Sequence, residues 1–139
     1  MDSNMTTEQP LDQLITDYLN GVVDVLISAG AEWLDELILE KSSHNQTKLS
    51  VDMGFSGGNR LSVHMRVGLC NDRVILRRYS MHFMNGDDST IFRYDNSRHF
   101  QGDGDSLDHK HESGGALACA QPSVRAVRDE IAAYLNADG

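Results

Sequence analysis

The sequence predicts an α+β protein in which an antiparallel meander of four strands is packed by N-terminal helices and a C-terminal helix. Three observations support this fold class: helical spacing of apolar residues near the N-terminus, a series of alternating segments separated by turn signals, and a second helical stripe near the C-terminus. One face of such a sheet is expected to pack against the helices, while the other exposes polar side chains. Residues 1–139 are interpreted as a single domain.

Helical segments are expected before the sheet. Residues 11–27 place apolar side chains at helical spacing, and residues 31–40 repeat the pattern. Residues 37–39 could equally begin a strand. We therefore interpret residues 1–43 as a helical N-terminal extension and residues 48–135 as the α+β core.

The strands are predicted from period-two alternation. Their expected ranges are 48–55, 60–69, 73–84 and 90–94. Asn85-Gly86 is a strong hairpin signal between the last two of them. One face of the third strand is predicted to carry Ile75, Arg77, Tyr79, Met81 and Phe83.

The C-terminal part is predicted to be a loop followed by a helix. Residues 95–121 are rich in Gly, Asp and Ser and offer little apolar surface to bury. Residues 123–135 place apolar side chains on one helical stripe, and Ser123 or Gln121 could cap that helix.

The charge of the chain is unevenly distributed. The net charge is −9, yet residues 60–100 carry seven arginines against four aspartates, which gives +3 and leaves −12 for the remainder. An acidic protein is ordinarily a poor nucleic-acid binder. The basic middle nevertheless allows a phosphate-rich ligand at one face, although arginines exposed at a sheet edge would give the same balance.

Composition also limits the cellular setting. No run of about 18 apolar residues is present, and the N-terminus is polar rather than basic and then apolar. The two cysteines resemble neither a metal knuckle nor a disulfide framework. We expect a cytoplasmic protein with no membrane segment.

The richest chemical signal lies between residues 92 and 111. His99, His109 and His111 fall within this stretch together with Asp95 and Lys110. Histidine titrates near neutral pH, so clustered histidines are typical of proton transfer or metal binding.

The stretch from Tyr79 to His111 also resembles a known family. It contains an aromatic strand, an Asn-Gly-Asp turn, Tyr94-Asp95-Asn96, a histidine and then His109-Lys110-His111. This pattern is similar to that of the TumE family of small toxins from toxin–antitoxin modules, over roughly residues 48–135. The chain departs from the family pattern at Phe100 and Asp108, where the family usually has histidines. The resemblance implies an RNA-directed toxin with a cognate antitoxin as partner.

Metal-free cleavage of RNA needs a base, an acid and a cation that holds the phosphorane charge. Candidate acid and base residues are His99 and either His109 or His111, while Asp95 could orient an imidazole. Tyr94 could donate a hydrogen bond or stack on a base. The candidate cations that would hold phosphate or bind RNA are Lys110, Arg93, Arg98 and Arg78.

Three other interpretations remain open. The histidines with Asp95 or Asp108 could hold zinc or another divalent cation, although no cofactor is required. Tyr-Asp-Asn could be a side-chain-bonded turn and His-Lys-His an ordinary strand. The protein could also be a non-catalytic interaction module that forms a homodimer or grips a partner through Leu14, Tyr18, Val22 and Leu26 of the first helix.

Overall fold

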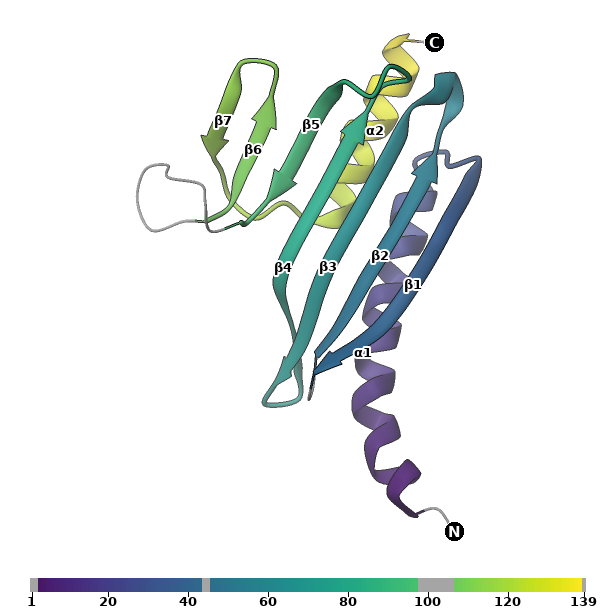
Figure 1. Ribbon diagram of the computed structural model, residues 1–139, viewed down its shortest axis with the longest axis vertical. Helices are drawn as coiled ribbons and strands as arrows, with labels where there is room; N and C mark the ends of the chain where they lie inside the picture. Colours follow the sequence, from purple (N-terminus) through teal and green to yellow (C-terminus); the bar gives the residue numbers. More distant parts are fainter. Residues whose placement is uncertain (1–2, 44–45, 98–106, 139) are drawn as a thin grey trace.

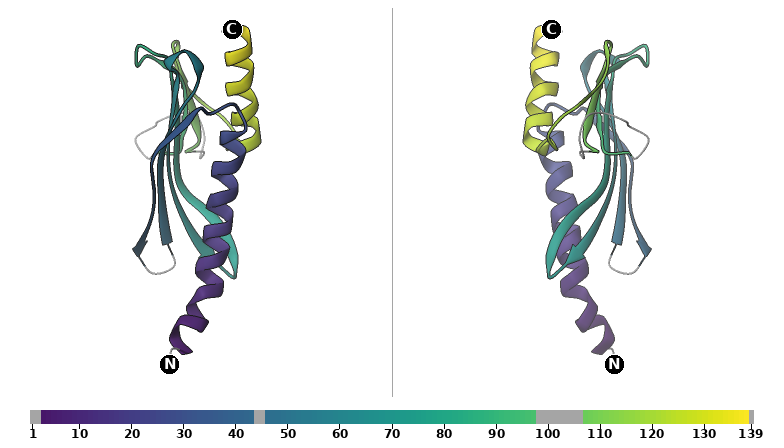
Figure 2. Two further views of the ribbon diagram at one scale, coloured as in Figure 1. Left: turned by 90° about the vertical axis from the view of Figure 1, so that its right-hand side faces the viewer. Right: turned by 90° about the vertical axis from the view of Figure 1, so that its left-hand side faces the viewer.

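The computed structural model describes residues 3–43, 46–97 and 107–138, and within them the chain forms an α+β structure with one antiparallel sheet and two helices. The sheet contains seven strands that pair in the order of the sequence (Figure 1). Both helices lie on the same face of the sheet (Figure 2). The elements are α1 (Ser3–Ile27), β1 (Trp33–Ser43), β2 (Gln46–Gly54), a 3₁₀ turn (Ser56–Gly58), β3 (Arg60–Cys70), β4 (Arg73–Met84), β5 (Thr90–Asp95), β6 (His109–Glu112), β7 (Gly115–Ala118) and α2 (Val124–Asp138).

The prediction of helices before the sheet is wrong in part, because only α1 precedes it and β1 occupies the predicted second helical segment. The pairing of β1 with β2 shifts between Asp35 and Ile38, and Glu36 has a positive φ of 51°. A bulge of this kind inserts residues into the alternation of a strand. Apolar residues spaced three or four apart therefore fit a strand here and imitate a helical pattern.

The prediction of four strands is also wrong, because β6 and β7 form a hairpin within the segment predicted to be a loop. Each has only four residues, and β7 has the sequence Gly-Ala-Leu-Ala. These strands lack the β-branched residues by which strands are usually recognised. Pairing with neighbouring strands makes these residues extended, since β6 continues the sheet from β5.

The central strands and the C-terminal helix follow the sequence prediction closely. Predicted core residues of β3, from Leu61 to Val67 at alternate positions, are each at most 3% exposed. Ser123 caps α2, because its Oγ accepts a hydrogen bond from the Ala126 amide at 3.0 Å. The β4–β5 turn is organised by Asn85, whose side-chain oxygen accepts from the amides of Asp87 and Ser89 at 2.8 and 3.1 Å.

A bulge in β4 changes the predicted alternation of that strand. Arg78 pairs with Arg66 but Leu76 pairs with Val67, so Arg77 is the additional residue. The side chains before the bulge therefore exchange faces, and Leu76 packs on the core in place of the predicted Ile75 and Arg77. The prediction remains correct beyond the bulge, where Tyr79, Met81 and Phe83 are buried.

The core lies between the sheet and the two helices. Phe83 is fully buried at its centre and meets the rings of Phe55, Phe92 and Tyr134 at centroid distances of 5.9, 5.5 and 5.5 Å. Helix α1 contributes Leu19 and Leu26, which are fully buried. The helices thus cover one face of the sheet, and we call the opposite face the outer face.

Two features of the fold bear on partners. In α1, Val22 and Leu26 pack into the core, Tyr18 is partly buried, and Leu14 is 42% exposed. Among the described residues, no helix has the length and apolar character needed to span a bilayer.

Replacing Phe83 with alanine is expected to lower the free energy of unfolding by about 3–5 kcal/mol, because it removes a ring that contacts three aromatic neighbours. Urea denaturation measures this loss. Ser80→Ala, on the outer face of the same strand, is the control and should change the stability by less than about 0.5 kcal/mol. Equal effects of the two substitutions would contradict this placement of the core.

Candidate functional site

Asp95 is the centre of a charged cluster on the outer face, at the last position of β5. The residue is only 5% exposed. Its Oδ2 lies 2.8 Å from Nε of Arg93, and its Oδ1 lies 2.6 Å from Nε2 of His109. The amide of Ser97 also donates a hydrogen bond to Oδ1 at 3.2 Å. Basic side chains and a backbone amide thus surround this carboxylate.

His109 is the fully buried member of the cluster. Its Nδ1 lies 2.9 Å from the carbonyl oxygen of Leu107. Because a carbonyl only accepts, Nδ1 carries a proton, and the second nitrogen faces the Asp95 carboxylate. The N–H directions of His109 Nε2 and Arg93 Nε are not aligned with a hydrogen bond, so both contacts with Asp95 are mainly electrostatic. His109 is positioned to hold the carboxylate rather than to meet a ligand.

His111 is the accessible imidazole, with its side chain 27% exposed. Arg93 donates through Nη2 to Nε2 of His111 at 2.9 Å, since a guanidinium has no acceptor. This nitrogen therefore accepts through its lone pair in this arrangement. The same nitrogen lies 3.6 Å from Oδ2 of Asp95.

His82 lies on the opposite side of Arg93. The sheet register places His82, Arg93 and His111 side by side on β4, β5 and β6. The Nε2 of His82 is 2.7 Å from the Thr90 hydroxyl. Burial, then the charges of Arg93 and Arg60, lower the pKa of His82. Two imidazoles therefore flank one guanidinium. The backbones of His82 and His111 are about 10 Å apart, because two strand spacings separate them.

The end of β5 is fixed to the bulge of β4 by Asn96. Its side-chain oxygen accepts from the Tyr79 amide at 3.0 Å, and its Nδ2 donates to the Arg77 carbonyl at 3.1 Å. The Tyr79 hydroxyl donates to Asp108 at 2.6 Å. Burial, then the bond to Asp108, raise the pKa of Tyr79. These contacts hold the segments that carry Asp95 and His109 against β4.

Tyr94 and Lys110 lie on the helix-facing side of the sheet, away from the cluster. Both contact Glu130 of α2, the Tyr94 hydroxyl at 2.7 Å and the Lys110 ammonium at 2.6 Å. Burial alone would lower the pKa of Lys110, but its hydrogen bonds to Glu130 and Tyr94 raise it on balance. Burial and the bond to Glu130 raise the pKa of Tyr94. Both side chains join α2 to the sheet.

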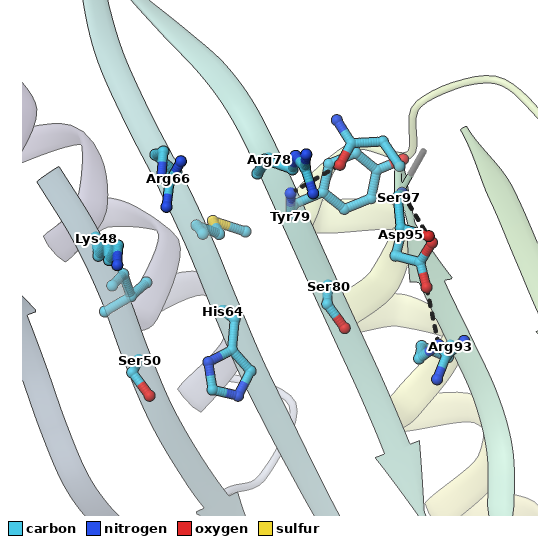
Figure 3. Close-up of a pocket in the computed structure, with 13 residues that line it drawn as sticks. Lys48, Ser50, His64, Arg66, Arg78, Tyr79, Ser80, Arg93, Asp95 and Ser97 are labelled. Atoms are coloured by element: carbon cyan, nitrogen blue, oxygen red, sulfur yellow. Dashed lines mark hydrogen bonds and ion pairs between the residues drawn. The ribbon is translucent and has the colours of Figure 1, made fainter. Parts of the chain in front are cut away.

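A pocket of about 570 Å³ extends across the outer face from Asp95 and Arg93 toward β2 (Figure 3). Its lining includes these charged and polar side chains: Lys48, Ser50, His64, Arg66, Arg78, Ser80, Arg93 and Asp95. Four cations and a single carboxylate thus face this pocket. Its electrostatic character favours an anionic ligand.

The structure brings together four of the sequence-predicted residues, namely Arg93, Asp95, His109 and His111, and places Arg78 in the adjoining pocket. His99 and Arg98 lie outside the described residues. Sequence analysis did not single out Lys48 and Arg66 as ligand contacts. Their signal was present in the alternation of β2 and β3, but their proximity depends on the register.

The cluster also has the composition of a metal centre. Ligand atoms of Asp95, His109 and His111 all lie within 4.8 Å of one another, and carboxylate with imidazole suits zinc. The guanidinium of Arg93, however, contacts both the Asp95 carboxylate and the lone pair of His111. A metal would have to displace Arg93, which already supplies the positive charge at this point.

Comparison with known proteins gives one match. A family model described as toxin TumE matches residues 25–137. No curated protein matches the chain. No solved structure matches it.

Replacing Asp95 with alanine is expected to lower the free energy of unfolding by about 3 kcal/mol, because it leaves the buried His109 and the partly buried Arg93 without their carboxylate partner. Asp52→Ala is the matched control. Asp52 is also an outer-face carboxylate but accepts only from the Ser62 hydroxyl, so its loss should cost about 1 kcal/mol. Chemical denaturation compares the two, and equal losses would contradict the central position of Asp95.

Proposed function

The chain belongs to the TumE toxin family, and from this premise we propose that it is the toxin of a toxin–antitoxin module and acts as a metal-independent ribonuclease. The observation that supports this chemistry most is the row in which His82 and His111 flank Arg93. Cleavage of RNA by its own 2′-hydroxyl needs two proton-transfer groups on either side of a phosphate and a cation between them. A cognate antitoxin protein is the proposed partner.

The two imidazoles suit different roles. His82 has a lowered pKa and is neutral at pH 7, so it suits the base that removes the 2′-hydroxyl proton. His111 lies 3.6 Å from the Asp95 carboxylate, which favours a protonated imidazole once phosphate has drawn Arg93 away from Nε2. His111 therefore suits the acid that protonates the leaving 5′-oxygen. The 2′-oxygen bonds to phosphorus as the 5′-oxygen departs, which leaves a 2′,3′-cyclic phosphate.

The remaining members of the cluster have supporting roles in this proposal. Arg93 would stabilise the charge that accumulates on the non-bridging phosphate oxygens. Asp95 would orient Arg93 and His111, with buried His109 holding its other oxygen. Tyr94 and Lys110 would support the site through α2 rather than contact RNA. His99 stays a prediction as a further acid or base.

Purified protein is expected to cleave single-stranded RNA at the same rate with and without EDTA. His111→Ala and His82→Ala should each reduce the rate by about 100-fold or more, because each removes one proton-transfer group. Asp129→Asn, at an exposed site on α2, is the control and should retain the wild-type rate. Separation of labelled products by gel measures these rates. Loss of cleavage in EDTA with recovery on adding zinc would instead assign Asp95, His109 and His111 to a metal centre.

The pH dependence gives a second test of the base. Activity should fall as the pH drops through the pKa of His82, because protonation removes its lone pair. Since that pKa is lowered from 6.5, the acidic limb of the pH–rate profile should lie below pH 6.5. If the residual activity of His82→Ala lacks this acidic limb, the assignment of His82 as the base is supported. An acidic limb above pH 6.5 would contradict it.

A non-catalytic interaction protein is the second candidate. The observation that favours it is the exposed apolar residues of β1, which is an edge strand of the described sheet. Its large apolar residues are 39–48% exposed, namely Trp33, Leu34, Leu37, Ile38 and Leu39. Such an edge is suited to contact another protein. A folded protein that cleaves no RNA under any condition would favour this candidate.

A further inference from the structure

Three cations form a straight row on the outer face. Lys48 pairs with Arg66, and Arg66 pairs with Arg78, so the three residues stand directly opposite one another on β2, β3 and β4. All three are exposed. Figure 3 shows these side chains in line at one end of the pocket. We call these residues the cation row.

The cation row is unfavourable for the protein alone. Side chains directly opposite in neighbouring strands have Cβ atoms about 5 Å apart, and like charges there destabilise the sheet. Glu40 is the register partner of Lys48 on β1. None of the ion pairs among the described residues, however, includes Glu40 or any member of the cation row. Within the described part of the chain, no ion pair therefore balances these three neighbouring positive charges.

The pocket connects the cation row to the proposed catalytic row. Arg78, Ser80 and His82 follow one another on the outer face of β4, so the two rows are about 13 Å apart at 3.3–3.4 Å per residue. Between them lies a row formed by Ser50, His64 and Ser80. The pocket lining includes all of this intermediate row and reaches Arg93 and Asp95. A chain bound at one row can therefore continue to the other.

We propose that the cation row binds backbone phosphates of a single-stranded RNA, on one side of the linkage placed at Arg93. This inference rests on the proposed ribonuclease function and adds to it the class of substrate and the path of its backbone. Polar contacts of Lys and Arg with phosphates provide affinity without reading the base sequence. The toxin would accordingly hold RNA by its backbone across β2, β3 and β4.

Two features favour a single strand over a duplex. A single line of cations follows one backbone, whereas proteins that bind double-stranded RNA contact phosphates and sugars across successive grooves. A basic groove that tracks one backbone is typical of single-strand binding. The phenol ring in the pocket lining, Tyr79, is buried and bonded to Asp108, so it is not placed to stack on a base. Recognition here therefore depends on phosphate charge.

The experiment is fluorescence anisotropy with a labelled single-stranded oligonucleotide that carries 2′-O-methyl groups, which prevent attack by the 2′-oxygen. The variant combines Lys48→Gln, Arg66→Gln and Arg78→Gln. Its affinity should be at least tenfold lower at low salt. The slope of log K against log salt should become less steep by about 2, because each lost phosphate contact on a single strand contributes about 0.7. The Tm of the free variant should rise, since the repulsion within the cation row is gone.

A charge-matched control distinguishes RNA binding at the cation row from a general effect of the net charge of the protein. It combines Arg73→Gln, Arg125→Gln and Arg128→Gln, which remove three cations from the start of β4 and from helix α2. This control should keep the wild-type affinity and salt slope. Equal weakening by both variants, or no weakening by the cation-row variant, would overturn the proposal. Binding of a duplex of the same length as tightly as the single strand would overturn the substrate class.

A second arm distinguishes failure of this inference from failure of the proposed function. The second arm uses unmodified RNA. If the wild type cleaves it and the cation-row variant cleaves it at the same rate, the proposed RNA binding by the cation row is overturned, but the proposed ribonuclease function stands. If the wild type cleaves no RNA but binds the 2′-O-methyl strand through the cation row, the proposed ribonuclease function is overturned, and the cation row remains a nucleic-acid binding site.

Discussion

The cluster around Asp95 depends on one buried carboxylate placed among three basic side chains. Arg93 and His109 contact separate oxygens of Asp95, and His111 lies next to both partners. A carboxylate in this position holds the buried His109 ring and fixes the Arg93 guanidinium at the mouth of the pocket. Because Asp95 ends β5 and pairs with the first residue of β6, the same contact also joins the last hairpin to the sheet.

Side chains of β5 and β6 alternate between the outer face and the core, so neighbouring residues in these strands have different structural roles. Arg93 and Asp95 face the outer side, while Phe92 and Tyr94 face the core and α2. Lys110 follows the same rule, since it contacts Glu130 although both neighbouring histidines belong to the cluster. The His-Lys-His sequence is therefore two outer-face imidazoles around an internal anchor, and its three side chains do not form one constellation.

Sequence reasoning predicted the fold class, the central strands and the last helix because regular alternation and capping chemistry are local properties. It failed at β1, where a bulge at Glu36 disrupts the alternation, and at β6, whose four residues gain order from pairing with β5. The spacing of His109 and His111 predicted that both lie on one side of an extended segment, and Asp95 was one of two carboxylates expected beside them. The pairing of Lys48 with Arg66 was not predicted, because the register of two consecutive strands depends on the geometry of the turn between them.

Placing the cluster and the cation row on the face opposite the helices has a consequence for how this toxin tolerates sequence change. Most outer-face residues, such as Lys48, Arg66 and Arg78, are exposed and contribute little to the core, so the fold does not depend on their identity. Asp95 and His109 are exceptions, since both are buried. Divergence among descendants should therefore accumulate along the path of the ligand, while this buried pair restricts which substitutions still permit folding.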